Sequence, residues 1–148
     1  MKRILPILLL LAGTAPGALL AQEAANDSVE VDLQIGGLIE LATCKGTTYA
    51  ALEMHRKSRT QLDLDKPGYD TLSGAGFFNW FFREGDFDSQ KVPCELKGKT
   101  FPIISMESFT DRNTGAVRDV LFLRVDKYTV IWCELGPALD ADEIRIVP

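Results

Sequence analysis

Runs of apolar and β-branched residues alternate with turn-forming residues through the C-terminal half of the chain. Four such runs cover residues 91–96, 99–109, 117–125 and 128–135, and a short fifth run follows at 144–147. Because short connections join antiparallel neighbours, the first four runs are predicted to form a β-meander. The third run is apolar on both faces at residues 120–123, which is typical of a strand that is covered on both sides.

The pattern in the N-terminal half is less uniform. Residues 29–41 alternate between apolar and polar side chains, which predicts a half-buried strand with a bend or bulge at Gly36-Gly37. Residues 48–59 can be interpreted in two ways, because they alternate like a strand yet contain Ala, Leu, Glu and Met, which favour helix. We predict a helix there and keep the strand as the alternative.

A second helix is predicted over residues 70–84, with Asp70 as its N-cap. Gly74 and Gly76 each cost about 1 kcal/mol relative to alanine inside a helix, so a start at residue 75 is the alternative. The order of elements predicts an α+β fold in which one or two helices pack on a curved antiparallel β-meander. A small OB-like β-barrel built from the same strands is the alternative.

The first 21 residues have the pattern of an export signal rather than that of a folded element. Lys2 and Arg3 precede an apolar run at residues 4–12, and Ala21 supplies a small residue at the expected cleavage point. The run is shorter than the ~20 apolar residues of a membrane-spanning helix. We therefore expect a periplasmic or secreted protein with a cleaved signal peptide at residues 1–21, a flexible leader at 22–28 and a single globular domain at 29–148.

The net charge of the chain argues against some classes of binding partner. The sequence holds 16 basic and 21 acidic residues, a net charge of −5, and removal of Lys2 and Arg3 with the signal brings the net charge to about −7. This balance disfavours binding to nucleic-acid phosphates or to anionic lipid. We expect neither a nucleic-acid partner nor membrane attachment after signal cleavage, and the oligomeric state is left open.

Three cysteines in an exported chain predict one disulfide and one remaining thiol. Cys94 and Cys133 fall on the first and last strands of the predicted meander, which approach each other if the sheet curls. We therefore predict a Cys94–Cys133 disulfide with Cys44 as the odd thiol. Loop-closure entropy does not separate the three possible pairings, so pairing of Cys44 with either of the others stays open.

The sequence contains few candidates for catalysis or metal binding. His55 is the only histidine, and the adjacent Arg56 and Lys57 indicate an exposed basic stretch rather than a Cys–His nucleophile pair. No Cys-x-x-Cys, Gly-x-Ser-x-Gly or glycine-rich phosphate loop is found. A zinc site formed by the cysteines and His55, or a calcium site at residues 63–74, would lack the usual ligand spacing. We expect no catalytic residue, no metal and no cofactor.

The most distinctive segment lies at residues 77–82, which are aromatic at five of six positions. Leaving five such side chains exposed would forgo about 10 kcal/mol of burial free energy, so most of them are predicted to lie in a core helix. One or two could instead line an apolar ligand pocket or a partner surface. The binding candidates are Phe77, Phe78, Trp80, Phe81 and the neighbouring Arg83.

These observations favour a small exported, non-catalytic binding or accessory domain for a partner protein or a small apolar ligand. One alternative is a small secreted hydrolase or transferase that uses carboxylates, and we lean against an enzyme because no nucleophile motif is found. Another alternative is an inhibitor or immunity-type protein whose acidic surface caps a basic site. A cleft with carboxylates of raised pKa would favour the enzyme, and an exposed apolar face would favour binding.

Overall fold

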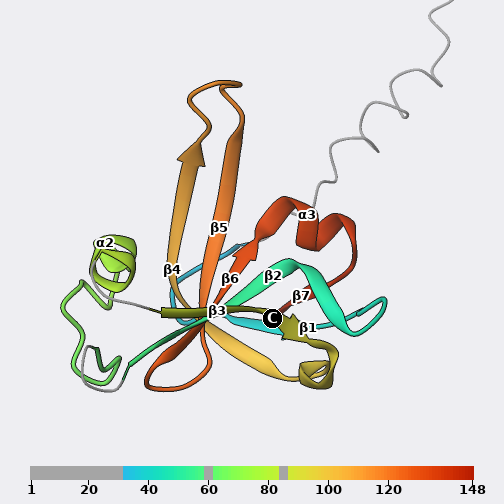
Figure 1. The fold of residues 1–148 in the computed structure, drawn as a ribbon, viewed down its shortest axis with the longest axis horizontal. Coiled ribbons are helices and arrows are strands. Elements are labelled where there is room, and N and C mark those ends of the chain that lie inside the picture. Colours follow the sequence, from blue (N-terminus) through green and yellow to red (C-terminus); the bar gives the residue numbers. More distant parts are fainter. Residues whose placement is uncertain (1–31, 59–61, 84–86) are drawn as a thin grey trace, which may run out of the picture. The chain divides into compact units, whose positions relative to one another are not determined.

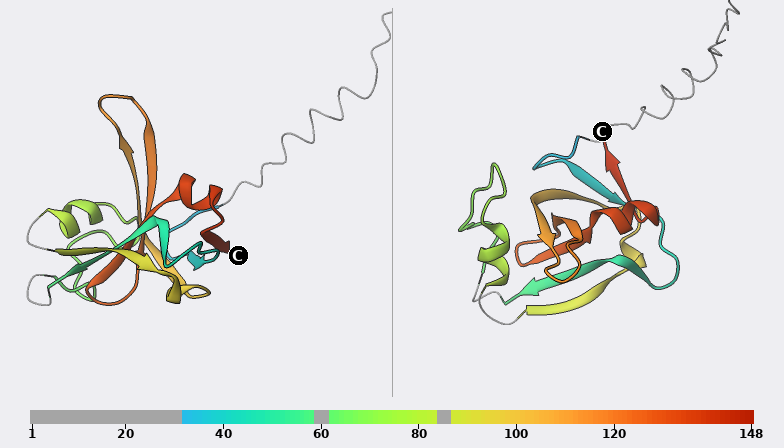
Figure 2. Two further views of the ribbon diagram at one scale, coloured as in Figure 1. Left: turned by 45° about the vertical axis from the view of Figure 1, so that its right-hand side comes forward. Right: turned by 90° about the horizontal axis from the view of Figure 1, so that it is seen from above.

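A seven-stranded antiparallel sheet dominates the part of the chain described by the structure, a computed structural model that describes residues 32–58, 62–83 and 87–148. The strand order is β3-β2-β6-β5-β4-β1-β7, and the sheet is strongly curled (Figures 1 and 2). Its elements are β1 (Leu38–Leu41), β2 (Thr48–Lys57), α2 (Phe77–Phe82), β3 (Phe87–Pro93), a 3₁₀ turn (Cys94–Leu96), β4 (Thr100–Thr110), β5 (Val117–Arg124), β6 (Thr129–Glu134), α3 (Leu135–Asp140) and β7 (Ile144–Val147). The predicted signal peptide, the leader and residues 29–31 lie outside the described residues.

The fold is mostly β, with one curled antiparallel sheet and two short helices among the described residues. This confirms the coarser part of the fold prediction and is compatible with the barrel-like alternative.

The predicted strand at 29–41 is confirmed only at β1, which follows a turn at Gly36 with a positive φ of 86°. The short final strand is confirmed as β7, and Gly136-Pro137 lies in α3, which begins directly after β6 ends at Glu134. Proline is well tolerated in the first turn of a helix, where its missing N–H has no intrahelical partner. No helix in the described ranges is long and apolar enough to cross a bilayer.

The predicted four-stranded meander has only three strands, β4, β5 and β6. The strand predicted at 91–96 is shifted to Phe87–Pro93 and pairs with β2 rather than with β4. The chain leaves β3 through the 3₁₀ turn and through Gly98, whose φ is 81°. A short connection therefore carries the chain from one edge of the curled sheet to the other side, instead of reversing it into a hairpin.

The helix predicted at residues 48–59 is wrong, since Thr48–Lys57 forms strand β2. This strand is hydrogen-bonded on one side to β3 and on the other to β6, so sheet pairing overrides the helix propensity of its residues. Leu52 and Met54 contact the core inside the curl, whereas Glu53 and His55 lie on the opposite face. The alternation of period two was therefore the better indicator.

The helix predicted over 70–84 is shorter than expected, because α2 begins at Phe77. Asp70 does not cap it, and its carboxylate instead accepts hydrogen bonds from the backbone N–H groups of Leu72 and Ser73 in the preceding turn. Gly74 has a φ of 74°, and a Cβ there would lie 2.8 Å from the carbonyl oxygen of Ile104. This turn needs glycine both for its conformation and for its close approach to β4.

The sheet separates two apolar clusters, as the two-sided pattern of β5 predicted. Leu121 and Leu123 point into the inner core, which is enclosed by the curl of the sheet. Val120 and Phe122 point to the other face, where they pack with Phe77 and Phe81 of α2. We call this second group the outer cluster; its buried members are Leu64, Phe77, Phe81, Val120, Phe122 and Val130.

The disulfide joins Cys44 to Cys94, with Cα atoms 5.7 Å apart, and the predicted Cys94–Cys133 pairing is wrong. Pro93 pairs with Thr48, which brings the end of β3 beside the loop that precedes β2. Cys133 lies on β6 opposite Leu52, so β2 separates it from Cys94. Cys133 is a buried free thiol, and burial, aided by Glu143 and Glu134, raises its pKa to about 12. A thiol in this state is a poor nucleophile.

Candidate functional site

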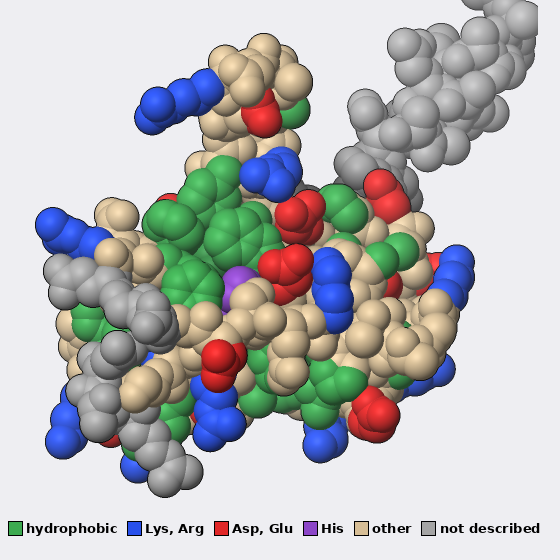
Figure 3. Space-filling view, in the orientation of Figure 1, with side chains coloured by type: hydrophobic (Ala, Val, Ile, Leu, Met, Phe, Trp, Pro, Cys, Tyr) green, Lys and Arg blue, Asp and Glu red, His purple; other side chains and the backbone are tan. Residues whose placement is uncertain are grey.

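A cavity of about 670 Å³ lies on the outer face of the sheet, where β2, β3, β5 and β6 meet residues of α2 and α3. Figure 3 shows the histidine at the edge of a patch of apolar side chains, with acidic and basic side chains beside it. The volume lies within the range of sites for small molecules. Its lining combines aromatic, charged and small side chains, namely Ala50, Ala51, Glu53, His55, Phe78, Phe82, Phe87, Lys91, Arg118, Trp132, Glu134, Pro137 and Ala141.

The strand register assembles the floor of this cavity. Glu53 of β2 is paired with Lys91 of β3 on one side and with Trp132 of β6 on the other. Trp132 is in turn paired with Phe122 of β5. Because directly paired residues point to the same face, these side chains form a row across four strands. His55 lies two residues further along β2 and therefore shares this face.

His55 is buried in an aromatic environment at the floor of the cavity, with 7% of its surface exposed. The rings of Phe82, Phe87 and Trp132 meet the imidazole edge to face, with centroids 5.3, 5.4 and 6.2 Å away. Neither ring nitrogen has a hydrogen-bond partner among the described residues, and the Oε2 atom of Glu53 is 3.8 Å from Nε2. The interpretation of His55 as an exposed residue is therefore wrong.

Burial determines the protonation state of this histidine. Removal from water lowers the pKa of His55 below its ordinary value of 6.5, and the negative charge of Glu53 only partly opposes the shift. At neutral pH the imidazole is therefore uncharged, with one N–H donor and one acceptor nitrogen.

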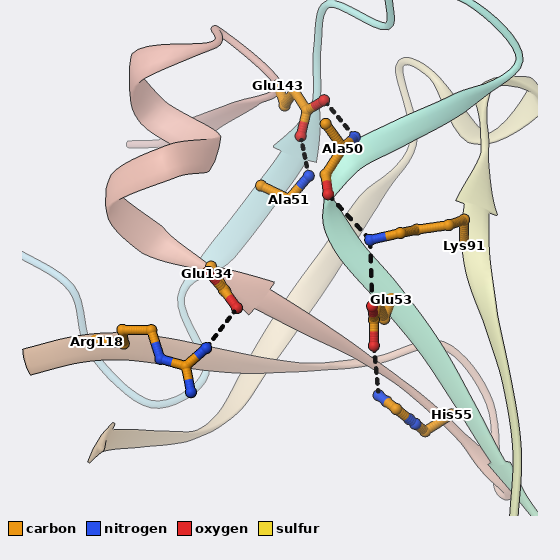
Figure 4. Close-up of polar contacts among 8 residues, drawn as sticks. All are labelled: Ala50, Ala51, Glu53, His55, Lys91, Arg118, Glu134 and Glu143. Carbon is orange, nitrogen blue, oxygen red and sulfur yellow. Dashed lines mark hydrogen bonds and ion pairs between the residues drawn. The ribbon is translucent and has the colours of Figure 1, made fainter. Parts of the chain in front are cut away.

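Two ion pairs between acidic and basic side chains lie among the residues that line the cavity (Figure 4). The ammonium of Lys91 is 3.1 Å from the Oε1 atom of Glu53 and also donates to the carbonyl oxygen of Ala50. The guanidinium of Arg118 is 3.3 Å from the Oε1 atom of Glu134. Both pairs are partly exposed, so each contributes little to stability, about 0 to 1 kcal/mol. Their main consequence is that positive and negative charges are balanced within the cavity.

A buried carboxylate fixes the wall formed by Ala50 and Ala51. Glu143, which is 5% exposed, accepts hydrogen bonds from the backbone N–H groups of Ala50 and Ala51, at 2.6 and 2.9 Å (Figure 4). The residues paired between β2 and β3 jump from Thr48 to Glu53, and the carboxylate satisfies two donors within that irregularity. Glu143 thus connects the corner between α3 and β7 to strand β2.

The binding candidates from the sequence are separated in the structure. Phe78 lines the cavity, whereas Phe77 and Phe81 are fully buried in the outer cluster. Trp80 and Arg83 line a different hollow of about 340 Å³. There the indole packs so closely on Gly68 that a Cβ at this glycine would lie 2.4 Å from the indole nitrogen.

Sequence reasoning missed most of the polar residues of the cavity, among them Glu53, His55 and Lys91. Interpreting 48–59 as a strand would have placed Glu53 and His55 on one face, two residues apart. The other contributors, Arg118, Trp132 and Glu134, could be found only from the register of β5 and β6.

The described residues offer no group of three or more His, Cys, Asp or Glu side chains placed to hold a metal ion. No family model, no curated protein and no solved structure matches this chain. The geometry of the cavity is therefore the basis on which a function can be argued.

Proposed function

We propose that this protein is a small exported, non-catalytic binding domain whose ligand is a small amphipathic molecule held in the outer-face cavity. The observation that carries the proposal is His55, a buried imidazole at the floor of the cavity for which the described part of the chain offers no hydrogen-bond partner. Buried polar groups in native proteins are nearly always paired, and an unpaired one costs about 1 to 3 kcal/mol. A bound ligand with a hydrogen-bonding group would recover that cost.

The rest of the lining supports an amphipathic ligand. Phe78, Phe82, Phe87 and Trp132 offer apolar surface, and the two ion pairs offer polar contacts beside it. Small-molecule sites commonly combine a mostly apolar wall with a few polar groups that fix orientation.

The proposal of a periplasmic or secreted location is supported by the disulfide. The Cys44–Cys94 bridge is compatible with an extracellular, oxidising compartment, where such bonds persist. The sequence pattern of residues 1–21 points the same way.

The composition of the cavity favours binding over catalysis. None of the described residues that line it is a serine, threonine or cysteine, and the carboxylates of Glu53 and Glu134 are each held in an ion pair with a basic side chain. The ammonium of Lys91 already contacts Glu53 and the carbonyl oxygen of Ala50. Each of these ion pairs would have to break before one of its side chains could act as a nucleophile.

A fluorescent probe tests the proposal. We expect the exported protein to bind prodan, an uncharged naphthalene dye whose emission shifts to the blue in apolar sites. Ala141→Phe fills the cavity from the end of α3, and Ala50→Phe fills it from β2. Each should weaken prodan binding by about tenfold or more, since the added ring occupies space that the dye needs.

The matched control is Ala116→Phe, which adds the same ring at an exposed position in the loop between β4 and β5. It should change the dissociation constant less than twofold. Near-UV circular dichroism of each variant checks that the fold is retained. The proposal is wrong if prodan does not bind the wild-type protein, or if correctly folded cavity-filling variants bind it as tightly as the control does.

A further inference from the structure

We infer that the cavity selects an uncharged aromatic molecule that carries a hydroxyl group, such as a phenol. Its ring lies among Phe82, Phe87 and Trp132, and its hydroxyl pairs with His55. This inference rests on the proposed function and names the class of ligand for the same site. Three features of the cavity lead to it.

The first feature is the balance of charge. Each basic group in the described lining already has a carboxylate within hydrogen-bond distance, Lys91 with Glu53 and Arg118 with Glu134. A ligand ion would have to displace one of these partners and would leave the other group of the pair uncompensated. An ion placed beside His55 would also lose its water without gaining an opposite charge. An uncharged ligand meets neither cost.

The second feature is the unsatisfied imidazole. A neutral imidazole has one donor nitrogen and one acceptor nitrogen, and both nitrogens of His55 lack a partner within residues 32–58, 62–83 and 87–148. A hydroxyl can donate to one nitrogen or accept from the other, so it fits either tautomer. A ligand group that only accepts, such as a carboxylate or an ether oxygen, fits one nitrogen alone. Glu53 is 3.8 Å from Nε2, beyond hydrogen-bond distance, and does not replace the ligand.

The third feature is the shape of the surrounding aromatic surface. Phe82 contacts Phe87 and Trp132 edge to face, and all three meet His55 in the same way. The flat ring of an aromatic ligand can make the same edge-to-face contact with these side chains, whereas a saturated ring cannot. Phe87, one of the rings that contact the imidazole, is 37% exposed.

Four probes of similar size separate these features. We would titrate 2-naphthol, naphthalene, decahydro-2-naphthol and 2-naphthoate against the exported protein, each in competition with prodan. We expect 2-naphthol to bind about tenfold more tightly than naphthalene, since one hydrogen bond to a buried group is gained. The saturated alcohol and the anion should each bind at least several-fold more weakly than 2-naphthol.

His55 gives a direct second readout. Because it is the only histidine in the chain, its ring nitrogens can be assigned in a ¹⁵N NMR spectrum without ambiguity. Binding of 2-naphthol should shift the resonance of one nitrogen, and naphthalene should shift it much less. In His55→Phe, the ratio between the affinities for 2-naphthol and naphthalene should fall from about ten to about one.

The outcomes separate this inference from the proposed function. If prodan binds, but 2-naphthoate or decahydro-2-naphthol displaces it as well as 2-naphthol does, the ligand class is wrong and the binding function stands. The ligand class is also wrong if the tenfold preference survives in His55→Phe, or if neither nitrogen resonance moves. If neither prodan nor any of the four compounds binds, the proposed function itself is wrong.

Discussion

The two faces of the curled sheet are built from the same strands but differ in how completely they are covered. On the inner side, Leu121, Leu123 and Ile131 are at most 1% exposed, and the curl of the sheet encloses them. On the outer side, α2 has only six residues and buries Phe77 and Phe81 while Phe78 and Phe82 stay half-buried. The inner face is closed by the sheet itself, whereas the short helix leaves part of the outer face as a cavity.

The difference shows how one strand can contribute to an enclosed core on one face and to a cavity on the other. Along β6, Ile131 and Cys133 face the inner core, while Trp132 and Glu134 face the cavity. Because alternate residues of a strand point to opposite faces, a substitution on the cavity face leaves the packing of the inner core in place. The outer face can therefore carry partly exposed aromatic rings and a buried histidine that lacks a hydrogen-bond partner among the described residues. The inner core stays closed on the opposite face.

Truncation of one apolar side chain on each face gives the largest expected effects. Leu123→Ala leaves a cavity in an enclosed core, so we expect a loss of about 2 to 5 kcal/mol in the free energy of unfolding. Phe78→Ala removes more atoms from a half-buried position that borders the ligand cavity, and water can fill the space. We expect it to cost less than Leu123→Ala does.

Urea denaturation followed by far-UV circular dichroism measures both changes. Prodan affinity should move in the opposite order, because Phe78 lines the cavity and Leu123 does not. Equal losses of stability for the two variants would mean that the outer face is as tightly closed as the inner one.

Glu143 connects the corner before β7 to strand β2 through two buried hydrogen bonds. Its replacement should have an effect of intermediate size on the free energy of unfolding. Glu143→Gln keeps the shape of the side chain but places an amide N–H₂ opposite the N–H group of either Ala50 or Ala51. Two donors then face each other in a buried position, and we expect a loss of about 1 to 3 kcal/mol. The measurement is again the free energy of unfolding, with Asp140→Asn at the exposed end of α3 as the matched carboxylate-to-amide control. A loss no greater than that of the control would show that the carboxylate does not fix this wall.

The sequence was informative where a pattern depends on local chemistry. Strands β4 to β7 were predicted to within a few residues, because alternation, turn residues and short connections all favour the same element. The two-sided burial of β5 was also visible in the run from Val120 to Leu123. The helix propensity of residues 48–59 was misleading, since β2 gains hydrogen bonds along both edges that no local scale contains.

The cavity could not be predicted, because it depends on register between distant segments. Glu53, Lys91 and Trp132 meet only because β2 lies between β3 and β6. The same strand order separates Cys94 from Cys133 and accounts for the wrong disulfide prediction. His55 was assigned to the surface from its charged neighbours, although Arg56 is exposed and His55 is buried in the same strand. In a strand, charged neighbours in sequence say little about the face on which a residue lies.

The smallest effect that we expect is a change in the free energy of unfolding with pH, and it is the effect most specific to the outer face. The pKa of folded His55 lies below its ordinary value of 6.5, so the unfolded chain binds a proton that the folded protein excludes. The free energy of unfolding should therefore fall as the pH drops through 6.5, with the loss complete below the folded pKa and absent above pH 7.5. Three carboxyls with lowered pKa values, Asp65, Asp70 and Asp111, affect stability only below about pH 4, and the buried thiol of the inner core does not titrate in this range.

Urea denaturation at pH 7.5, 6.5 and 5.5 should show a decline for the wild-type protein that His55→Phe removes. A decline of equal size in both proteins would mean that the histidine does not carry the pH dependence, and that burial does not lower its pKa in the folded protein.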